Sequence, residues 1–154
     1  HLKLASYALS MPPIYDGWFL TKTNFSYRGD KMKESFAELI ELTKKSLKHD
    51  PWCNDNGLKG YCESIIKETE ELKEAVNKKD HKNLKEELGD VLLCWCHACM
   101  LAEQEKLFTT KEVIDSIRNK LTRRKPYILT NTTVTKEEAV EIWKQVKEQE
   151  KHKK

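Results

Sequence analysis

The stretch from Val91 to Ala102 contains no Asp, Glu, Lys or Arg, and it limits the possible folds more than any other feature. Its side chains are apolar on nearly every side of a helix, so we expect it to be the buried centre of a helical bundle. It is far shorter than the roughly 20 apolar residues that span a bilayer, so no transmembrane helix is predicted. Only five Gly and four Pro are present, too few for the turns of a β-sandwich or barrel. An all-α fold is therefore predicted.

The composition describes an ordinary small domain. The chain has 154 residues, of which 38% are hydrophobic, enough for one modest core. Its net charge of +3 is too small to indicate a nucleic-acid partner. The odd number of cysteines, five, favours a reduced intracellular protein, and the opening segment lacks the pattern of a signal peptide. We therefore expect a cytoplasmic protein that binds neither nucleic acid nor membranes.

The pattern divides the chain into three parts. Residues 1–31 mix aromatic side chains with Pro and Gly without periodicity, and we expect an irregular N-terminal arm there. Residues 32–151 are expected to form the all-α domain, a bundle of about five helices, and residues 152–154 a basic tail. The capping residues expected to open four of the helices are Asp30, Asp80, Thr109 with Glu112, and Thr135 with Glu138, whereas the other helix is expected over about 58–77, after a break at residues 50–57.

Two glutamates stand out on the helix predicted over 58–77. Its apolar stripe is centred on Ile65, with Glu68 at the margin and Glu71 further along the same flank. Their spacing of three makes them neighbours on the helix surface. The predicted stripe consists of Leu58, Tyr61, Cys62, Ile65, Thr69, Leu72 and Val76.

The next helix repeats the acidic pair as Glu87 and Asp90, directly before the apolar stretch. Gly89 between them costs about 1 kcal/mol relative to Ala in a helix, which we interpret as a place where a ligand or another helix approaches closely. Four converging carboxylates at about 6 Å would repel by roughly 3 kcal/mol per pair at an effective dielectric near 20. A hard divalent cation such as Mg²⁺ is the natural occupant of such a cluster. The alternative interpretation is a set of surface acids paired with the neighbouring residues Lys67, Lys73 and Lys85.

Three motifs in order carry a resemblance to a known family. Glu68-x-x-Glu71 is followed by Glu87-Leu88-Gly89-Asp90-Val91-Leu92-Leu93 and then by Asn119-Lys120-Leu121-Thr122-Arg123-Arg124-Lys125-Pro126-Tyr127. This arrangement resembles the MazG-type nucleoside triphosphate pyrophosphohydrolases of the all-α NTP pyrophosphatase superfamily. The resemblance covers about residues 32–151 and includes the loop around Trp52 and the late helix around Trp143.

The resemblance implies an enzyme that hydrolyses nucleoside triphosphates between the α and β phosphates, giving a monophosphate and pyrophosphate, in house-cleaning of the nucleotide pool. It implies Mg²⁺ as cofactor, with Mn²⁺ as an alternative, and assembly as a homodimer or homotetramer. The residues to which it assigns roles are Glu68, Glu71, Glu87 and Asp90 as catalytic metal ligands, Lys120, Arg123 and Arg124 on the polyphosphate tail, and Trp52 stacked on a base.

The chain departs from the family pattern at two places. Lys67 stands where the family usually has a second acid, and the loop reads Asp50-Pro51-Trp52-Cys53 where the family usually reads Cys-Pro-Trp-Asp. Two alternatives therefore remain: a substrate-specific superfamily relative acting on dCTP, dUTP or phosphoribosyl-ATP, and a non-catalytic helical interaction module on the same scaffold. His97 shares a flank with Asp90, but we expect it to be a hydrogen-bonded core histidine.

Overall fold

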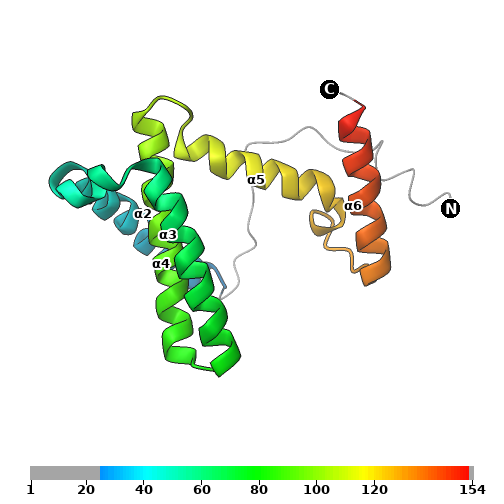
Figure 1. Ribbon diagram of the computed structural model, residues 1–154. Coiled ribbons are helices and arrows are strands. Elements are labelled where there is room, and N and C mark those ends of the chain that lie inside the picture. Colours follow the sequence, from blue (N-terminus) through cyan, green and yellow to red (C-terminus); the bar gives the residue numbers. More distant parts are fainter. Residues whose placement is uncertain (1–24, 153–154) are drawn as a thin grey trace. The chain divides into compact units, whose positions relative to one another are not determined.

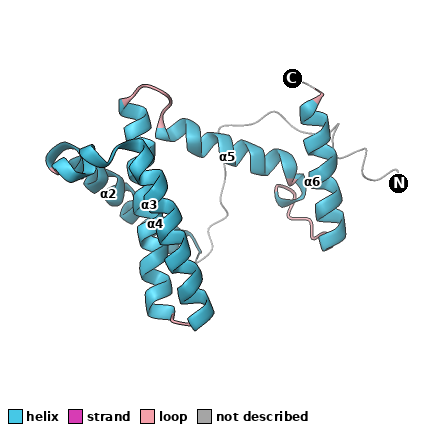
Figure 2. Cartoon of the chain, viewed as in Figure 1, coloured by secondary structure: helices cyan, strands magenta, loops and turns pink. Residues whose placement is uncertain are grey.

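The computed structural model describes residues 25–152, and all regular secondary structure in that range is helical (Figure 2). The all-α prediction is confirmed for this part of the chain. The described residues belong to two compact units, 25–113 and 114–152. None of the helices in this range is both long enough and apolar enough to cross a membrane.

The first helix, α2 (Phe25–His49), begins earlier than the sequence indicated. Asp30 lies within it and does not cap it; its carboxylate instead pairs with Lys33, 3.2 Å away. A capping residue opens a helix only where the preceding backbone leaves helical geometry, and here the helix continues through that point. The predicted irregular arm is therefore wrong over residues 25–31, while residues 1–24 and the tail residues 153 and 154 lie outside the described part.

The second helix, α3 (Pro51–Lys78), starts directly after its N-cap Asp50, whose side chain accepts a hydrogen bond from the Trp52 backbone N–H at 3.0 Å. Proline at the first helical position suits this start, because its missing N–H would be unpaired there anyway. The predicted start near residue 58 was late, but an interruption does exist. Gly57 has φ 61°, a left-handed conformation that glycine adopts at little cost.

A very short turn joins α3 to α4 (His81–Gln104), so the two helices run side by side in opposite directions (Figure 1). Lys79 adopts the left-handed conformation at the end of α3, and the Asp80 N–H bonds the Ala75 carbonyl at 3.0 Å. The Asp80 side chain then caps α4, as predicted, by accepting from the N–H groups of Lys82 and Asn83.

The core of the first unit lies where α2 packs against the α3–α4 hairpin. Its buried members are Leu47 from α2, Cys53 and Tyr61 from α3, and Met100 and Leu101 from α4. The apolar stretch of α4 is buried in its second half, but Leu92 and Leu93 in its first half are partly exposed. The prediction that the whole stretch is buried is therefore correct only for its carboxyl-terminal half.

The second unit contains most of α5 (Thr110–Arg124), the short 3-10 helix η1 (Pro126–Ile128) and α6 (Lys136–Lys151). Both predicted capping signals are confirmed. Thr109 and Glu112 form reciprocal hydrogen bonds at the start of α5, and Thr135 and Glu138 form a capping box at α6. None of the residues in α5, η1 or α6 is fully buried.

Candidate metal centre

Three of the four predicted metal ligands meet between α3 and α4. One carboxylate oxygen from each of Glu68, Glu71 and Glu87 lies within 4.8 Å of the others. The hairpin explains this meeting, because α3 and α4 run antiparallel on either side of the turn at Lys79 (Figure 1). We call these three residues the acidic cluster.

The flank of α3 that carries Glu68 and Glu71 faces α4 more directly than the sequence pattern indicated. Ala75 on that flank is buried, whereas Cys62, Thr69 and Val76 from the predicted stripe are exposed. The buried face of α3 is thus turned toward Glu68 and Glu71, because α3 packs chiefly on α4 within the described part of the chain. The predicted stripe was wrong at those three positions, and the correction moves the acids inward.

Glu87 is the most enclosed member of the cluster, with 6% of its surface exposed. Its Oε2 atom is buried and has no hydrogen-bond partner. Burial raises the pKa of this carboxyl, and the charges of Glu71, Glu68 and Asp90 raise it further. A buried acceptor without a partner is unfavourable, and a cation is the partner that would relieve both the burial and the repulsion. Hard oxygen donors gathered at this distance fit a divalent cation such as Mg²⁺ or Mn²⁺.

Asp90 lies one turn beyond Glu87 on α4 and is half-buried. It does not belong to the group of three whose oxygens lie within 4.8 Å of one another. Its charge nevertheless raises the pKa of Glu87, so the two groups interact electrostatically. The structure therefore assembles three predicted ligands and leaves the fourth beside them.

Lys67 borders the cluster and partly neutralises it. Its ammonium lies 2.7 Å from a Glu71 oxygen and 3.4 Å from a Glu68 oxygen, while the lysine side chain itself stays largely exposed. These contacts raise the pKa of Lys67. Lys67 therefore offsets part of the negative charge of the acidic cluster. Among the residues that the structure describes, the buried Oε2 atom of Glu87 has no partner of its own.

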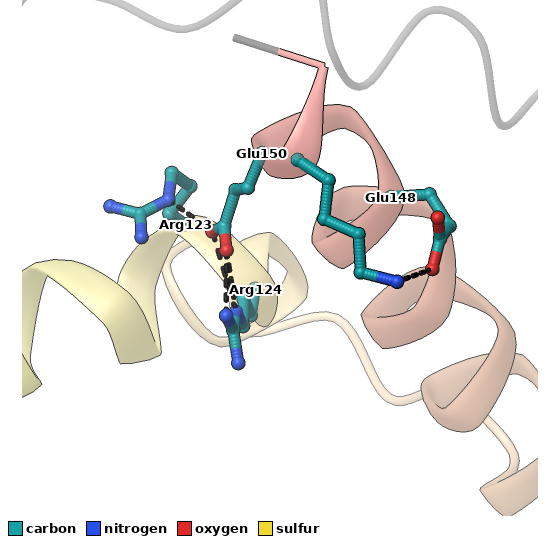
Figure 3. Close-up of polar contacts among 5 residues, drawn as sticks. Arg123, Arg124, Glu148 and Glu150 are labelled. Carbon is teal, nitrogen blue, oxygen red and sulfur yellow. Dashed lines mark hydrogen bonds and ion pairs between the residues drawn. The ribbon is translucent and has the colours of Figure 1, made fainter. Parts of the chain in front are cut away.

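The predicted polyphosphate-binding residues lie at the end of α5, in the second unit. Lys120 is half-buried one turn before Arg124. Arg123 and Arg124 both form ion pairs with Glu150, near the end of α6 (Figure 3). Figure 3 shows the two arginines converging on one carboxylate. The sequence contains no local signal for this pairing, because Glu150 lies more than twenty residues further along the chain.

Trp52 stands apart from the acidic cluster at the start of α3. Its side chain is 65% exposed and meets the ring of Tyr61 edge-on, with ring centroids 6.4 Å apart. Tyr61 in turn stacks on His97 at 4.7 Å. An exposed indole is compatible with the predicted stacking on a base, which stays a prediction.

His97 is buried and fully engaged, as expected of a core histidine. Its Nε2 lies 2.7 Å from the Ser46 hydroxyl, and its Nδ1 lies 3.0 Å from the Leu93 carbonyl oxygen. Burial lowers its pKa, which favours the neutral ring. His97 thus joins α2 to α4 and takes no part in the acidic cluster.

Comparison with known proteins shows the family of this chain. Residues 57–129, which include the acidic cluster and the basic motif of α5, match the model of the MazG nucleotide pyrophosphohydrolase domain. The crystal structure of a MazG-related protein from Thermotoga maritima matches with a TM-score of 0.69 and 30% sequence identity, over 73% of this chain and 98% of that one. This chain belongs to the MazG family.

Curated relatives agree with this assignment. The nucleoside triphosphate pyrophosphohydrolase/pyrophosphatase MazG of Thermotoga maritima is 34% identical over 132 residues, covering 80% of this chain and 49% of the relative. A nucleoside triphosphate pyrophosphohydrolase of Mycobacterium tuberculosis is 29% identical over 131 residues, covering 84% of this chain and 39% of the relative. The chain thus spans about half the length, or less, of these relatives.

The structure shows the surroundings of the residues that depart from the expected MazG pattern. Lys67 pairs with Glu68 and Glu71 of the acidic cluster. In the loop, Asp50 is the N-cap of α3 and Cys53 is buried in the core. Asp50 and Cys53 therefore contribute to the start of α3 and its packing, whereas Lys67 changes the charge of the acidic cluster itself.

Proposed function

We propose that this chain hydrolyses nucleoside triphosphates between the α and β phosphates, releasing a nucleoside monophosphate and pyrophosphate, with Mg²⁺ as cofactor and Mn²⁺ as an alternative. The observation that carries the proposal is the acidic cluster, in which Glu68, Glu71 and Glu87 meet around a buried, unpartnered oxygen of Glu87. Membership of the MazG family and the names of its curated relatives support the reaction class. Removal of unwanted nucleotides from the pool is the role we propose for it.

In this proposal the acidic residues bind the cation, and one of them accepts a proton from the attacking water. Glu68, Glu71 and Glu87 hold the metal, with Asp90 as the further ligand beside them. When bound, the cation neutralises phosphate charge and makes water more acidic. One of the three glutamates accepts the proton of the attacking water, whose oxygen joins the released monophosphate or pyrophosphate as the phosphoanhydride bond breaks.

The basic residues of α5 bind the polyphosphate tail. Arginine suits phosphate through two parallel hydrogen bonds, and lysine contributes a point charge. The residues proposed for this task are Lys120, Arg123 and Arg124, and Trp52 is proposed to stack on the base.

We also propose that the chain works as a homodimer or homotetramer. Leu88 is 54% exposed, and Leu92, one turn further along α4, is also exposed. On α5, Ile117 and Leu121 repeat this spacing and are likewise exposed. Apolar side chains aligned in this way are typical of surfaces covered by another chain. Light scattering should give two or four copies for the chain, and Leu92→Lys should yield monomers; a monomeric parent chain would contradict this part of the proposal.

The alternative is a non-catalytic interaction module, and Lys67 is the observation that favours it. Its ammonium already offsets the charge of Glu68 and Glu71, as a structural cation would. A substrate-restricted enzyme acting on dCTP, dUTP or phosphoribosyl-ATP is the other alternative. All three candidates differ in which triphosphates, if any, they consume.

A substrate panel separates them. Pyrophosphate release is measured for the ribonucleoside and deoxyribonucleoside triphosphates and phosphoribosyl-ATP, with Mg²⁺, with Mn²⁺ and with chelator. Glu71→Gln should lower the rate by orders of magnitude, as should Asp90→Asn. Glu63→Gln is the matched control, because Glu63 lies on the same helix and its exposed side chain pairs with the exposed Lys59 at 3.8 Å.

Each outcome decides between the candidates. Release from several triphosphates supports the broad enzyme, and release from one supports the restricted enzyme. No release from any substrate, with either metal, favours the interaction module and overturns the proposal. Activity retained in both Glu71→Gln and Asp90→Asn would remove these residues from the catalytic site.

A further inference from the structure

One carboxylate at the end of α6 engages two adjacent arginines of the basic motif. The Arg124 Nε–H and Nη2–H groups donate to Glu150 Oε2 at 3.1 Å and 2.6 Å, and the Arg123 Nε–H donates to Oε1 at 2.5 Å (Figure 3). The Arg124 and Glu150 side chains are 17% and 23% exposed, so this contact is far more enclosed than an ordinary surface ion pair. Two donors from one guanidinium fix its direction as well as its distance.

Trp143 restrains Arg124 from a second side. The Arg124 guanidinium lies 4.9 Å from the centroid of the Trp143 ring, and the Lys125 ammonium lies 5.9 Å from the same centroid. The indole face limits the plane of the guanidinium while Glu150 limits its rotation. Arg124 therefore lacks most of the freedom that a long side chain at a helix end would have.

The contact leaves each arginine with N–H groups that Glu150 does not use. Glu150 engages Nε of Arg123, and Nε with Nη2 of Arg124. A guanidinium carries five N–H donors, so Nη1 of Arg124 and both Nη groups of Arg123 are not engaged by Glu150. A phosphate could accept hydrogen bonds from these groups without displacing the carboxylate.

The charge balance also favours an incoming anion. Arg124 and Arg123 lower the pKa of Glu150 to about 2, so the carboxylate stays ionised at neutral pH. Two guanidinium groups against one carboxylate leave a net positive charge, and Lys125 adds to it. The arrangement differs from a neutral, self-satisfied ion pair, which would have little attraction for a phosphate.

We propose that Glu150 is a positioning residue that holds Arg123 and Arg124 in the orientation that receives the phosphates of the nucleotide. This inference rests on the proposed function, because the two arginines are assigned there to the polyphosphate tail. If Glu150 instead competed with phosphate for the arginines, removing its carboxylate would tighten phosphate binding. The sign of the change on removing the carboxylate therefore decides between them.

The test compares two glutamate-to-glutamine variants of the full chain. Glu150→Gln removes the carboxylate that contacts the arginines, and Glu148→Gln removes the same charge two residues away, where the carboxylate pairs with Lys151 at 2.8 Å (Figure 3). Binding of inorganic tripolyphosphate by calorimetry and the KM of a triphosphate substrate are measured for both. Glu150→Gln should weaken tripolyphosphate binding and raise KM by about tenfold with a smaller effect on kcat, and Glu148→Gln should change each by less than about twofold.

A second measurement reads the orientation of the arginines directly. Hydrogen-bonded Arg Nε–H groups exchange slowly with water, so NMR of the parent chain should show protected signals for Arg123 and Arg124, assigned through Arg123→Lys and Arg124→Lys. Both signals should lose protection in Glu150→Gln and keep it in Glu148→Gln. Glu150→Asp, which keeps the charge on a shorter side chain, should restore part of the tripolyphosphate affinity, which a role in packing alone would not explain.

The possible results are all decisive. Unchanged or tighter tripolyphosphate binding in Glu150→Gln overturns the inference, the latter by showing competition. If the parent chain releases no pyrophosphate but Glu150→Gln still weakens tripolyphosphate binding and frees the arginines, the proposed enzymatic function fails while the positioning role stands. If Glu150→Gln loses its circular dichroism, Glu150→Asp and the NMR signals of the parent chain carry the test.

Discussion

Glu71 on α3 and Glu87 on α4 are equidistant along the chain from Lys79 at the turn, eight residues before it and eight after it. Glu68 and Asp90 are related in the same way, at eleven residues on either side. Because both helices rise by about 1.5 Å per residue, equal separations bring each pair to a similar level in the antiparallel hairpin. The tight turn therefore sets the register in which the two acidic motifs meet.

Glu87→Gln should raise the stability of the metal-free chain and lower its activity. Glutamine keeps the size of the side chain but removes a buried charge that lies among other carboxylates, so the metal-free chain should melt at a higher temperature. The increase in melting temperature on adding Mg²⁺ should shrink sharply, and pyrophosphate release should fall by orders of magnitude. Thermal melts with and without Mg²⁺ check the first two results. A Mg²⁺ shift equal to that of the parent chain would exclude Glu87 as a ligand.

The effect of Glu87 on stability should depend on pH with a definite sign. Its pKa is raised above the ordinary 4.5, so the folded state binds the proton more tightly than the unfolded state. Stability from this group is complete below that ordinary value and is lost as the pH rises through the raised pKa. The difference in melting temperature between Glu87→Gln and the parent chain, without metal, should therefore widen from pH 4.5 towards pH 7. A constant difference in melting temperature across this range would show that the pKa of Glu87 is not raised in the folded chain.

Lys67→Gln should tighten binding of the divalent cation. The Lys67 ammonium contacts Glu71 and Glu68, so it competes with a metal for the same oxygens. Because the lysine is exposed and screened by solvent, the expected gain is only about two- to fivefold in the dissociation constant for Mn²⁺, measured by calorimetry. Lys59→Gln is the control, because Lys59 forms a comparable pair with Glu63 away from the cluster. Weaker Mn²⁺ binding in Lys67→Gln would mean that the lysine supports the site.

Gly89→Ala should stabilise the chain by about 1 kcal/mol, the usual difference between these residues in a helix interior. A Cβ atom at Gly89 would have no atom within 4 Å in the described structure apart from its chain neighbours and the backbone of its own helix, so no clash offsets the gain. Urea unfolding measures the free energy, and light scattering under the same conditions measures assembly. A loss of stability or a change in the number of copies would show that another chain or a ligand approaches this position closely, as the sequence pattern suggested.

Much of the local structure followed from short-range signals. Asp80, Thr109 with Glu112, and Thr135 with Glu138 were correctly expected to open helices, because each cap satisfies backbone N–H groups within a few residues. Asp30 carried a similar signal but lies within α2. A cap shows where a helix can begin, whereas the preceding residues decide whether it does.

Face assignments were less reliable than helix positions. Periodicity centred the buried stripe of α3 on Ile65, but the structure exposes Val76 and buries Ala75. The apolar stretch of α4 similarly exposes Leu92 despite its lack of charge. Periodicity reports how apolar each side of a helix is, while burial depends on which neighbour covers that side.

The sequence by itself determined the helical fold class, most of the caps and the two acidic motifs, because these depend on residues close together in the chain. The tertiary structure decided which carboxylates meet, that Glu87 is the buried one with an unpartnered oxygen, and that Lys67 reaches two of its neighbours. It also decided that Glu150 contacts both arginines. Such contacts join residues far apart along the chain, and only the turns and packing of the helices bring them within reach of one another.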